Sequence, residues 1–214
     1  GLLAGLGIGG LAVAMAARET LANFFGGLVI FTDHPFRLGD WTRVGDVEGT
    51  VEQIGFRSTR VRTFPKTLVT IPNSQVVSQV VENKSKMPVR RVFATVGVTY
   101  ETTAEQMETL LEDFKEILKN DEGVDQEYIV VRFVEFGDSS LDILLYFFTK
   151  PTAYAEHTEV VERINLAVMR AVEARGLSVA FPTRTVYFEG DVAKAFAGRL
   201  PPPETARPEP PREQ

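Results

Sequence analysis

The first 31 residues differ from the rest of the chain in their pattern of hydrophobic and polar positions. Residues 1–17 carry no charged side chain and include five glycines and five alanines. Glycine costs about 1 kcal/mol relative to alanine inside a soluble helix, whereas in a membrane small residues let helix backbones approach closely. Gly1, Gly5 and Gly9 have the four-residue spacing of such packing. The pattern predicts a membrane helix that packs against copies of itself.

A second apolar stretch, residues 20–31, follows a predicted break at Arg18 and Glu19. Its large apolar residues recur at helical spacing, which is typical both of an amphipathic helix on the membrane surface and of a buried core helix. The adjoining apolar run favours the membrane interpretation. The pair Gly26-Gly27 lies within this stretch, and paired glycines indicate a kink. Residues 1–31 are therefore expected to form one helical domain with a kink and an amphipathic continuation.

Residues 32–88 have the alternating pattern of a small β domain. Pro35 ends the helical pattern, and short β-branched segments separated by turn residues follow from Asp40 to Pro72. This spacing predicts four or five antiparallel strands. Residues 73–82 carry mixed signals, which we interpret as a short helix and a final strand.

Residues 89–190 alternate between strand and helix patterns. Strands are expected at 90–100, 127–136, 140–150 and 184–190, and helices at 103–120 and 158–176. The order β-α-β-β-α-β is that of the ferredoxin-like arrangement. Thr103 and Gln106 have capping-box spacing, and Gly176 stands where a helix commonly ends. Residues 191–214 contain six prolines between 201 and 211, which predicts an extended or disordered tail.

Composition excludes several classes of site. The chain has 214 residues, a net charge of −6, no cysteine and two histidines far apart in sequence. Disulfides and thiolate metal sites are therefore excluded, and no metal centre or cofactor is expected. The acidic balance argues against a general nucleic-acid surface. Gly5, Gly7 and Gly10 match a dinucleotide-binding spacing, but no strand precedes them, and no motif assigns catalytic residues.

Several longer segments together resemble the small-conductance mechanosensitive channel (MscS) family. They are GIGGLAVAMAARETLANFFGGLVIF, HPFRLGD, VEGTVEQIGFRSTRVRT, VTIPNSQV, FGDSSLDILLYFFTK and VAFPTRTVYF. In detail they are closer to the low-conductance members with extra transmembrane helices. The chain does not begin with methionine and starts within the apolar run, and we expect helices upstream of it, because one short glycine-rich span is a poor sole membrane anchor.

The resemblance implies both a fold and an activity. The fold is a pore-lining membrane helix followed by an Sm-like β barrel and an α+β ferredoxin-like domain, with residues after about 31 in the cytoplasm. Family members are homoheptamers of the bacterial inner membrane. Membrane tension opens them, and they release ions and small osmolytes after hypo-osmotic shock. No cofactor, nucleic acid or catalytic role is implied.

The resemblance also implies roles for individual residues of the helix. Leu11 and Met15 are four apart, and hence on one helix face, where the family places its hydrophobic gate. The alternative is that both are ordinary contacts between helices. The remaining residues are assigned to four roles. Gly7, Gly10, Ala12 and Ala14 are assigned to small-residue packing between helices, and Arg18 and Glu19 to the pore mouth. Asn23, Gly26 and Gly27 are assigned to a hinge, and Arg37 to coupling with the membrane domain. The alternative for Arg18 and Glu19 is that they pair with neighbours on the surface, and Arg37 is equally compatible with a solvated surface position.

Other functional classes remain as alternatives. The chain is also compatible with a non-conducting membrane-anchored scaffold, and its β domain with a soluble Sm-like nucleic-acid-binding protein, because a fold does not determine a function. A channel requires detergent or lipid for solubility and forms a ring-shaped oligomer. An RNA-binding protein is expected to be soluble without residues 1–31 and to retain RNA on purification.

Overall fold

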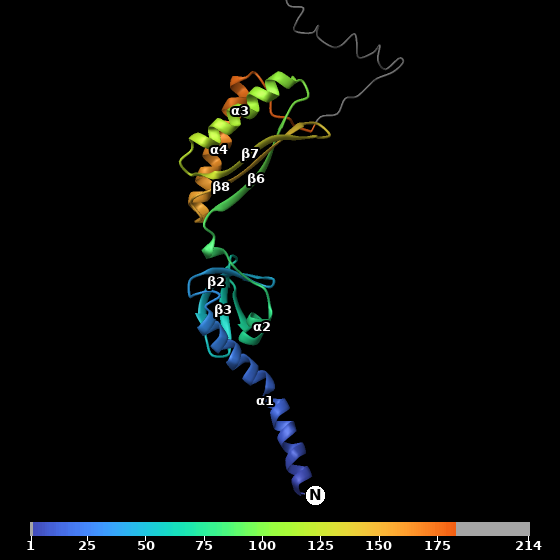
Figure 1. The fold of residues 1–214 in the computed structure, drawn as a ribbon, viewed down its shortest axis with the longest axis vertical. Helices are drawn as coiled ribbons and strands as arrows, with labels where there is room; N and C mark the ends of the chain where they lie inside the picture. Colours follow the sequence, from blue (N-terminus) through green and yellow to red (C-terminus); the bar gives the residue numbers. More distant parts are fainter. Residues whose placement is uncertain (1, 183–214) are drawn as a thin grey trace, which may run out of the picture.

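The computed structural model describes residues 2–182, which form three units in a row along the long axis of the molecule (Figure 1). Helix α1 (Leu2–Asp33) occupies one end, a β domain lies in the middle, and an α+β domain occupies the other end. The fold class predicted from the sequence is thus confirmed. The predicted strand at 184–190 and the tail at 191–214 lie outside the described residues.

Helix α1 is continuous over 32 residues. The break predicted at Arg18 and Glu19 is wrong, because both are good helix formers and neither removes a backbone hydrogen bond. The helix also continues through Gly26 and Gly27. It ends just before Pro35, where His34 takes a positive φ of 48°.

The β domain is a five-stranded antiparallel sheet. Its elements are β1 (Trp41–Val44), β2 (Val47–Ile54), β3 (Ser58–Thr63), β4 (Leu68–Pro72), α2 (Asn73–Ser78) and β5 (Val81–Asn83). The strand order is β4-β3-β2-β1-β5, so the last strand, β5, pairs with the first, β1. Ile30 of α1 and Phe36 are buried in the same core as Val51, Val61 and Val76. The end of the apolar helix is therefore part of the β domain's core.

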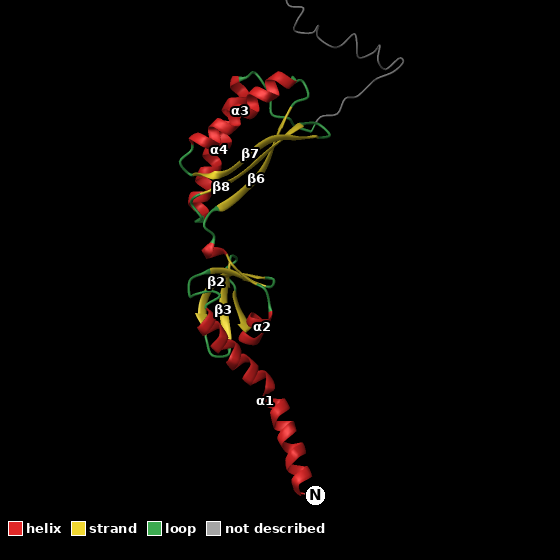
Figure 2. Cartoon of the chain, viewed as in Figure 1, coloured by secondary structure: helices red, strands yellow, loops and turns green. Residues whose placement is uncertain are grey.

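The C-terminal domain consists of two layers. After the short 3₁₀ helix η1 (Lys84–Lys86), its elements are β6 (Arg90–Val98), α3 (Ala104–Asn120), β7 (Val124–Phe136), β8 (Leu141–Thr149) and α4 (Tyr154–Ala174). Strand β8 lies between β6 and β7 and is antiparallel to both, which gives the split β-α-β arrangement predicted from the sequence. Helices α3 and α4 cover one face of this sheet (Figure 2).

The details of this domain follow from local sequence signals. Alternate residues of β8, from Leu141 to Thr149, are buried beneath the helices. The Thr103–Gln106 capping box is present at the start of α3, and Gly176 takes a φ of 66° just after α4. Beyond it, Val179 forms a bridge with Val98 at the free edge of β6.

Candidate functional site

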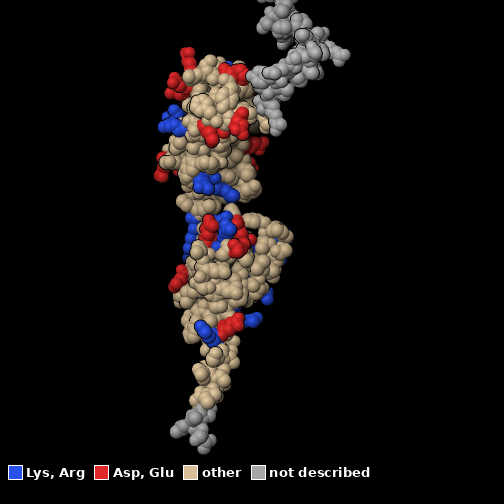
Figure 3. All heavy atoms as spheres, turned by 90° about the vertical axis from the view of Figure 1, so that its right-hand side faces the viewer, with Lys and Arg blue, Asp and Glu red and all other residues tan. Residues whose placement is uncertain are grey.

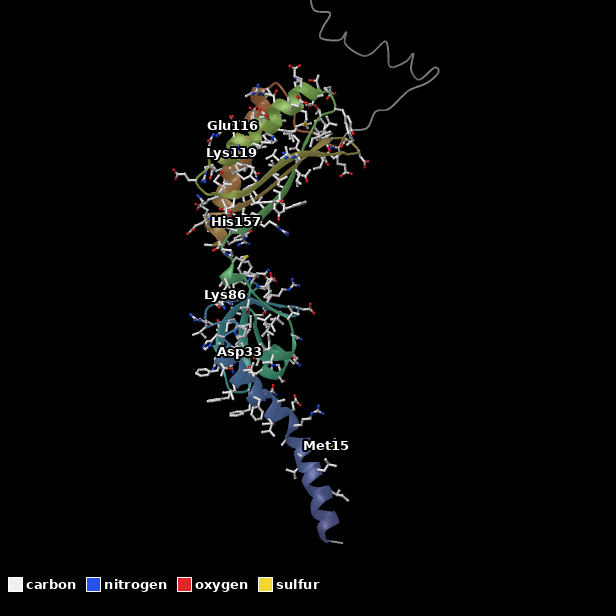
Figure 4. All side chains as sticks on the ribbon, viewed as in Figure 1. Met15, Asp33, Lys86, Glu116, Lys119 and His157 are labelled. Carbon is white, nitrogen blue, oxygen red and sulfur yellow. The ribbon has the colours of Figure 1, made fainter. Side chains whose placement is uncertain are left out.

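The N-terminal half of α1 projects from the β domain. Leu11 and Met15 are 63% and 70% exposed, and Figure 4 shows Met15 on a stretch of helix distant from both domains. Within residues 2–182 one helical segment, Gly7–Asp33, is long and apolar enough to cross a membrane. In Figure 3 the described N-terminal end of this helix carries no charged side chain. The exposed apolar surface implies an apolar environment or further helices around this segment.

The faces of α1 around Leu11 and Met15 differ in side-chain size. At about 100° per residue, Leu11 and Met15 form one narrow ridge, which we call the Leu11–Met15 ridge. Gly10 and Ala14 lie on one flank of the ridge and Ala12 lies on the other. Within the described chain, nothing lies within 4 Å of a Cβ built on Gly7 or Gly10. The flank of Gly10 and Ala14 is therefore open to close approach by another helix, whereas Ile8, 73% exposed, lies between the ridge and Ala12 on the other flank.

The charged pair Arg18–Glu19 lies about one turn beyond Met15, and both side chains are exposed. Neither residue has a salt bridge among those found in residues 2–182. Arg18 and Glu19 thus mark the point where the uncharged part of α1 ends.

The second half of α1 is attached to the β domain through Asn23. This side chain is only 5% exposed, and its Oδ1 accepts hydrogen bonds from the backbone N of Ser74 (3.1 Å) and from Ser74 Oγ (2.8 Å). Ser74 is in the first turn of α2, whose N-cap residue, Pro72, provides no side-chain acceptor. Asn23 therefore satisfies a backbone donor at the start of a helix 51 residues away in sequence.

Gly26 and Gly27 lie where α1 approaches the β domain most closely. A Cβ on Gly26 would be 2.8 Å from the carbonyl carbon and oxygen of Asn73, and one on Gly27 would be 2.6 Å from the carbonyl oxygen of Phe56. These neighbours are backbone atoms that move only with their segments. The two glycines are thus required for the close contact of α1 with α2 and with the turn between β2 and β3; their predicted role as a hinge stays a prediction.

Asn73 and Ser74, which our sequence analysis did not assign to the site, complete this contact. Asn73 is fully buried: its Oδ1 accepts from Thr59 Oγ1 (3.0 Å) and its Nδ2 donates to the carbonyl oxygen of Gly55 (2.9 Å). Asn73 thereby fixes the position of α2 against β3. Both residues lie in the segment VTIPNSQV that carried the resemblance, but no local pattern indicates their partner on α1.

Arg37 lies just beyond the end of α1 with an exposed side chain. Its backbone N donates to Asp40 Oδ2 (2.8 Å), and the same oxygen accepts from Asn83 Nδ2 (2.8 Å). These bonds fix the turn that carries Arg37. No side-chain partner of Arg37 is found in residues 2–182, and its predicted coupling role stays a prediction.

Family models match two consecutive parts of the chain. The model described as "Mechanosensitive ion channel, beta-domain" matches residues 19–86, and the one described as "Mechanosensitive ion channel MscS, C-terminal" matches residues 92–179. The first covers the Asn23 contact, and the second covers most of the described C-terminal domain. The chain belongs to the MscS family.

Curated relatives in the MscS family have similar sequences. An uncharacterised MscS family protein of Aquifex aeolicus is 45% identical over 88% of this chain and 51% of its own length. MscMJ of Methanocaldococcus jannaschii, named a small-conductance mechanosensitive channel, is 44% identical over 89% and 54%. YnaI of Escherichia coli, named a low conductance mechanosensitive channel, is 40% identical over 97% and 58%. The chain thus spans about half the length of these relatives.

Solved MscS-family structures have the same fold. Arabidopsis thaliana MSL1 matches with a TM-score of 0.78 at 25% identity, covering 85% of this chain and 66% of that one. Helicobacter pylori MscS in its closed state matches with a TM-score of 0.73 at 25% identity, covering 89% and 74%. The MscS family consists of channels and not of enzymes. Within the described residues, no group of three or more acidic or histidine side chains is placed to hold a metal ion.

Proposed function

We propose that this chain is a subunit of a tension-gated channel that releases ions and small osmolytes during hypo-osmotic shock. Its assembly is a homo-oligomer, a heptamer, in the bacterial inner membrane, with residues after about 31 in the cytoplasm. The observation that carries the proposal is the exposed Leu11–Met15 ridge, on an apolar helix that is joined directly to an MscS β domain.

A ring of α1 helices explains the chemistry of the Leu11–Met15 ridge. If the ridge of each copy points to the ring axis, Leu11 and Met15 form two apolar collars about 6 Å apart along the helix. A narrow apolar constriction excludes water and hence ions without being physically plugged. Arg18 and Glu19 then lie one turn below the lower collar, at the cytoplasmic mouth.

The small residues on the flanks explain how such a ring can open. In a ring, one flank of each helix meets the opposite flank of the next helix. Gly10 and Ala14 of one copy would then face Ala12 of its neighbour. Gly7 lies on the same flank as Gly10 and Ala14. When these helices slide under tension, the small residues of the Gly10–Ala14 flank offer no large side chain for the neighbouring helix to pass.

The lower part of α1 connects this gate to the cytoplasmic domains and to lipid. Asn23, Gly26 and Gly27 hold it against the β domain, and a change in its angle at this contact is the proposed hinge. Phe24, Leu28 and Phe31 are exposed beside Phe56 around an apolar groove of about 360 Å³. This apolar surface fits a position at the lipid boundary, with Arg37 beside it.

The proposal predicts that a hydrophilic collar abolishes the closed state. We expect the double variant Leu11→Asn and Met15→Asn of the full-length protein to conduct without suction, because polar collars hold water in the constriction. The measurement is single-channel recording in giant bacterial spheroplasts from a host that lacks its own mechanosensitive channels, under graded suction.

Val13→Asn is the matched control, because Val13 is 69% exposed on the side of α1 away from the Leu11–Met15 ridge. It makes the same chemical change outside the pore and should leave the closed channel tight. A double variant as non-leaky as the unmodified protein would contradict the proposed gate. Absence of any suction-dependent current in the unmodified full-length protein would contradict the channel itself.

A further inference from the structure

The C-terminal domain has an exposed cluster of four aromatic side chains on its sheet. Because Leu145 and Phe147 of β8 are buried beneath the helices, their neighbours Tyr146 and Phe148 lie on the opposite face. Phe93 of β6 is the cross-strand partner of Tyr146, and Tyr128 of β7 lies beside them. We call these four residues, Phe93, Tyr128, Tyr146 and Phe148, the aromatic face.

The rings of the aromatic face touch one another edge to face. Their centroids are 5.8 Å apart for Phe93 and Tyr146, 5.4 Å for Tyr128 and Tyr146, and 5.5 Å for Tyr146 and Phe148. Phe93 is nonetheless 64% exposed and Tyr128 is 54% exposed. The helices α3 and α4 lie on the other side of the sheet (Figure 1). A contiguous apolar patch of this kind, outside the membrane, marks an interaction surface.

Two arginines flank the aromatic face. Arg91 lies directly across from Phe148, and Arg132 lies directly across from Leu144 on the same side of the sheet. Both are exposed, and neither forms a salt bridge with another described residue. Asp125 of β7 also lies directly across from Phe148, so the surface is an apolar centre with charges of both signs at its edge, as in the centre and rim of many protein interfaces.

The outer face of α4 has the complementary character. The side of α4 that meets the sheet is formed by Val160, Ile164, Val168 and Val172. On the opposite side, Leu166 and Met169 are 40% and 47% exposed, and Glu162 and Glu173 lie one turn before and after them. Arg170, one turn after Leu166, is exposed on the same side, so this face is an apolar pair bordered by two carboxylates and one guanidinium group.

We propose that the aromatic face of one copy of this chain packs on the outer face of α4 of the next copy. The proposal rests on the proposed function, which requires a closed ring of identical subunits. A ring needs two different surfaces that meet head to tail, and these two lie on opposite sides of one two-layer domain. Opposite charges at the rim set the register, and Met169 among aromatic rings makes the favourable sulfur–aromatic contact.

Single-stranded RNA is the competing occupant of the aromatic face. Aromatic side chains on the sheet of a β-α-β-β-α-β domain also serve as stacking platforms for bases. The net charge of −6 and the position of Asp125 across from Phe148 favour a protein partner, because RNA binding depends on positive charge around the platform. The experiment includes an arm that distinguishes the two.

Crosslinking tests the contact directly in the full-length protein, in detergent. This chain contains no cysteine, so introduced thiols in it are unique. We expect the double variant Phe93→Cys and Met169→Cys, treated with a short bifunctional maleimide, to give a ladder of covalent oligomers on a denaturing gel. Each single variant should remain monomeric, because neither surface meets itself. Phe93→Cys combined with Lys119→Cys, which is exposed on α3, is the matched control and should give no ladder.

Charge reversal tests the same contact independently. We expect Arg91→Glu with Arg132→Glu to lower the crosslinking yield at least about tenfold, because like charges would then face each other. Adding Glu162→Arg and Glu173→Arg should restore the yield. Failure of this rescue, with the reversed protein still folded by circular dichroism, would overturn the proposed pairing.

The remaining outcomes separate this inference from the proposed function. Ring-shaped particles in electron micrographs without a crosslinked ladder would overturn the contact and leave the channel assembly intact. Dimers from Phe93→Cys alone would overturn it in favour of two sheets meeting each other. RNA that copurifies and is lost in Phe93→Ala with Tyr128→Ala would assign the aromatic face to nucleic acid. Absence of any ring would overturn both the contact and the proposed function.

Discussion

At the scale of single residues, the contact between α1 and the β domain depends on two hydrogen bonds to Asn23 Oδ1. Helix α2 begins after Pro72, which cannot accept a hydrogen bond from the first turn through its side chain. The cap is therefore supplied by another helix, and the backbone N of Ser74 has its acceptor only when α1 packs against the β domain. This arrangement makes the position of the apolar helix and the stability of the β domain interdependent.

Removal of this cap should be measurable. We expect Asn23→Ala to lower the free energy of unfolding of the β domain by about 1 kcal/mol, because the backbone N of Ser74 loses its acceptor. Thermal unfolding of the full-length protein in detergent measures the loss. In a double-mutant cycle with Ser74→Ala, we expect a coupling of at least about 0.5 kcal/mol.

Ser78→Ala is the matched control for this cycle. Its hydroxyl donates to the carbonyl oxygen of Gln75 within the same helix, 3.1 Å away, and does not contact α1. Asn23→Ala and Ser78→Ala should therefore be additive. Additivity of Asn23→Ala with Ser74→Ala as well would show that the contact contributes nothing to the stability of the fold.

At the scale of elements, local signals predicted the strands and helices well. The capping box of α3, the alternation of β8 and the position of Gly176 depend on residues close in sequence. Helix α4 begins at Tyr154, four residues before the predicted start at 158, because its first turn has no side-chain cap to mark it. The break at Arg18 was wrong because charge alone does not end a helix.

The candidate site was only partly predictable, because only some of its contacts depend on residues close in sequence. The spacing of Leu11 and Met15 is visible in the sequence, because a helix face depends on positions four apart. The Asn23–Ser74 contact spans 51 residues, and the buried Asn73 is fixed by Thr59 and Gly55 on other segments. Gly26 and Gly27 indicated a hinge from sequence, but their close contact with Asn73 and Phe56 requires the fold.

The flank of α1 supports a prediction about helix sliding. We expect Gly10→Leu or Ala14→Leu to raise the membrane tension needed for opening, because a large side chain must pass the neighbouring helix. Patch recording in spheroplasts measures the threshold. No described atom lies within 4 Å of a Cβ built on Gly10, so an effect of Gly10→Leu would arise from other chains or lipid.

Two controls isolate this effect. Gly10→Ala keeps a small side chain at the same position and should change the threshold less than Gly10→Leu. Val13→Leu enlarges a side chain that is 69% exposed, on the side of α1 away from the Leu11–Met15 ridge and about 100° from Ala14, and it should change the threshold less than Ala14→Leu. An unaltered threshold in both leucine variants of the flank would contradict the packing of Gly10 and Ala14 against a neighbour.

At the scale of the whole molecule, the two cytoplasmic domains meet at Arg90. Its guanidinium carbon lies 5.2 Å from the ring centroid of Trp41 in the β domain and 5.2 Å from that of Tyr154 in α4. One of its nitrogens, Nη1, also donates to the carbonyl oxygen of Thr152 (3.3 Å). These contacts border a cavity of about 650 Å³ between the domains. Within one chain, a change in the angle of α1 would reach the C-terminal domain through these contacts and through the segment that links the two domains.

His157, labelled beside this junction in Figure 4, is a half-buried titratable residue of the C-terminal domain. Its Nδ1 lies 2.8 Å from Thr149 Oγ1. Burial, and secondarily the positive charge of Arg90, lower the pKa of His157 from its usual value of 6.5. The folded state therefore binds this proton less readily than the unfolded state, and stability is present above pH 6.5 and lost as the pH falls below it.

We accordingly expect the C-terminal domain of the full-length protein to unfold at a lower temperature at about pH 5.5 than at about pH 7.5. His157→Gln keeps a polar partner for Thr149 but cannot be protonated in this range, so it should reduce the difference. His34→Gln, at the exposed end of α1, is the matched control and should not. Carboxylates such as Asp121, whose pKa is lowered by its hydrogen bond with Arg163, lose their contribution only as the pH falls through lower values, from about 3.8 downward. An equal pH dependence in His157→Gln and the unmodified protein would therefore show that the junction does not titrate through this residue.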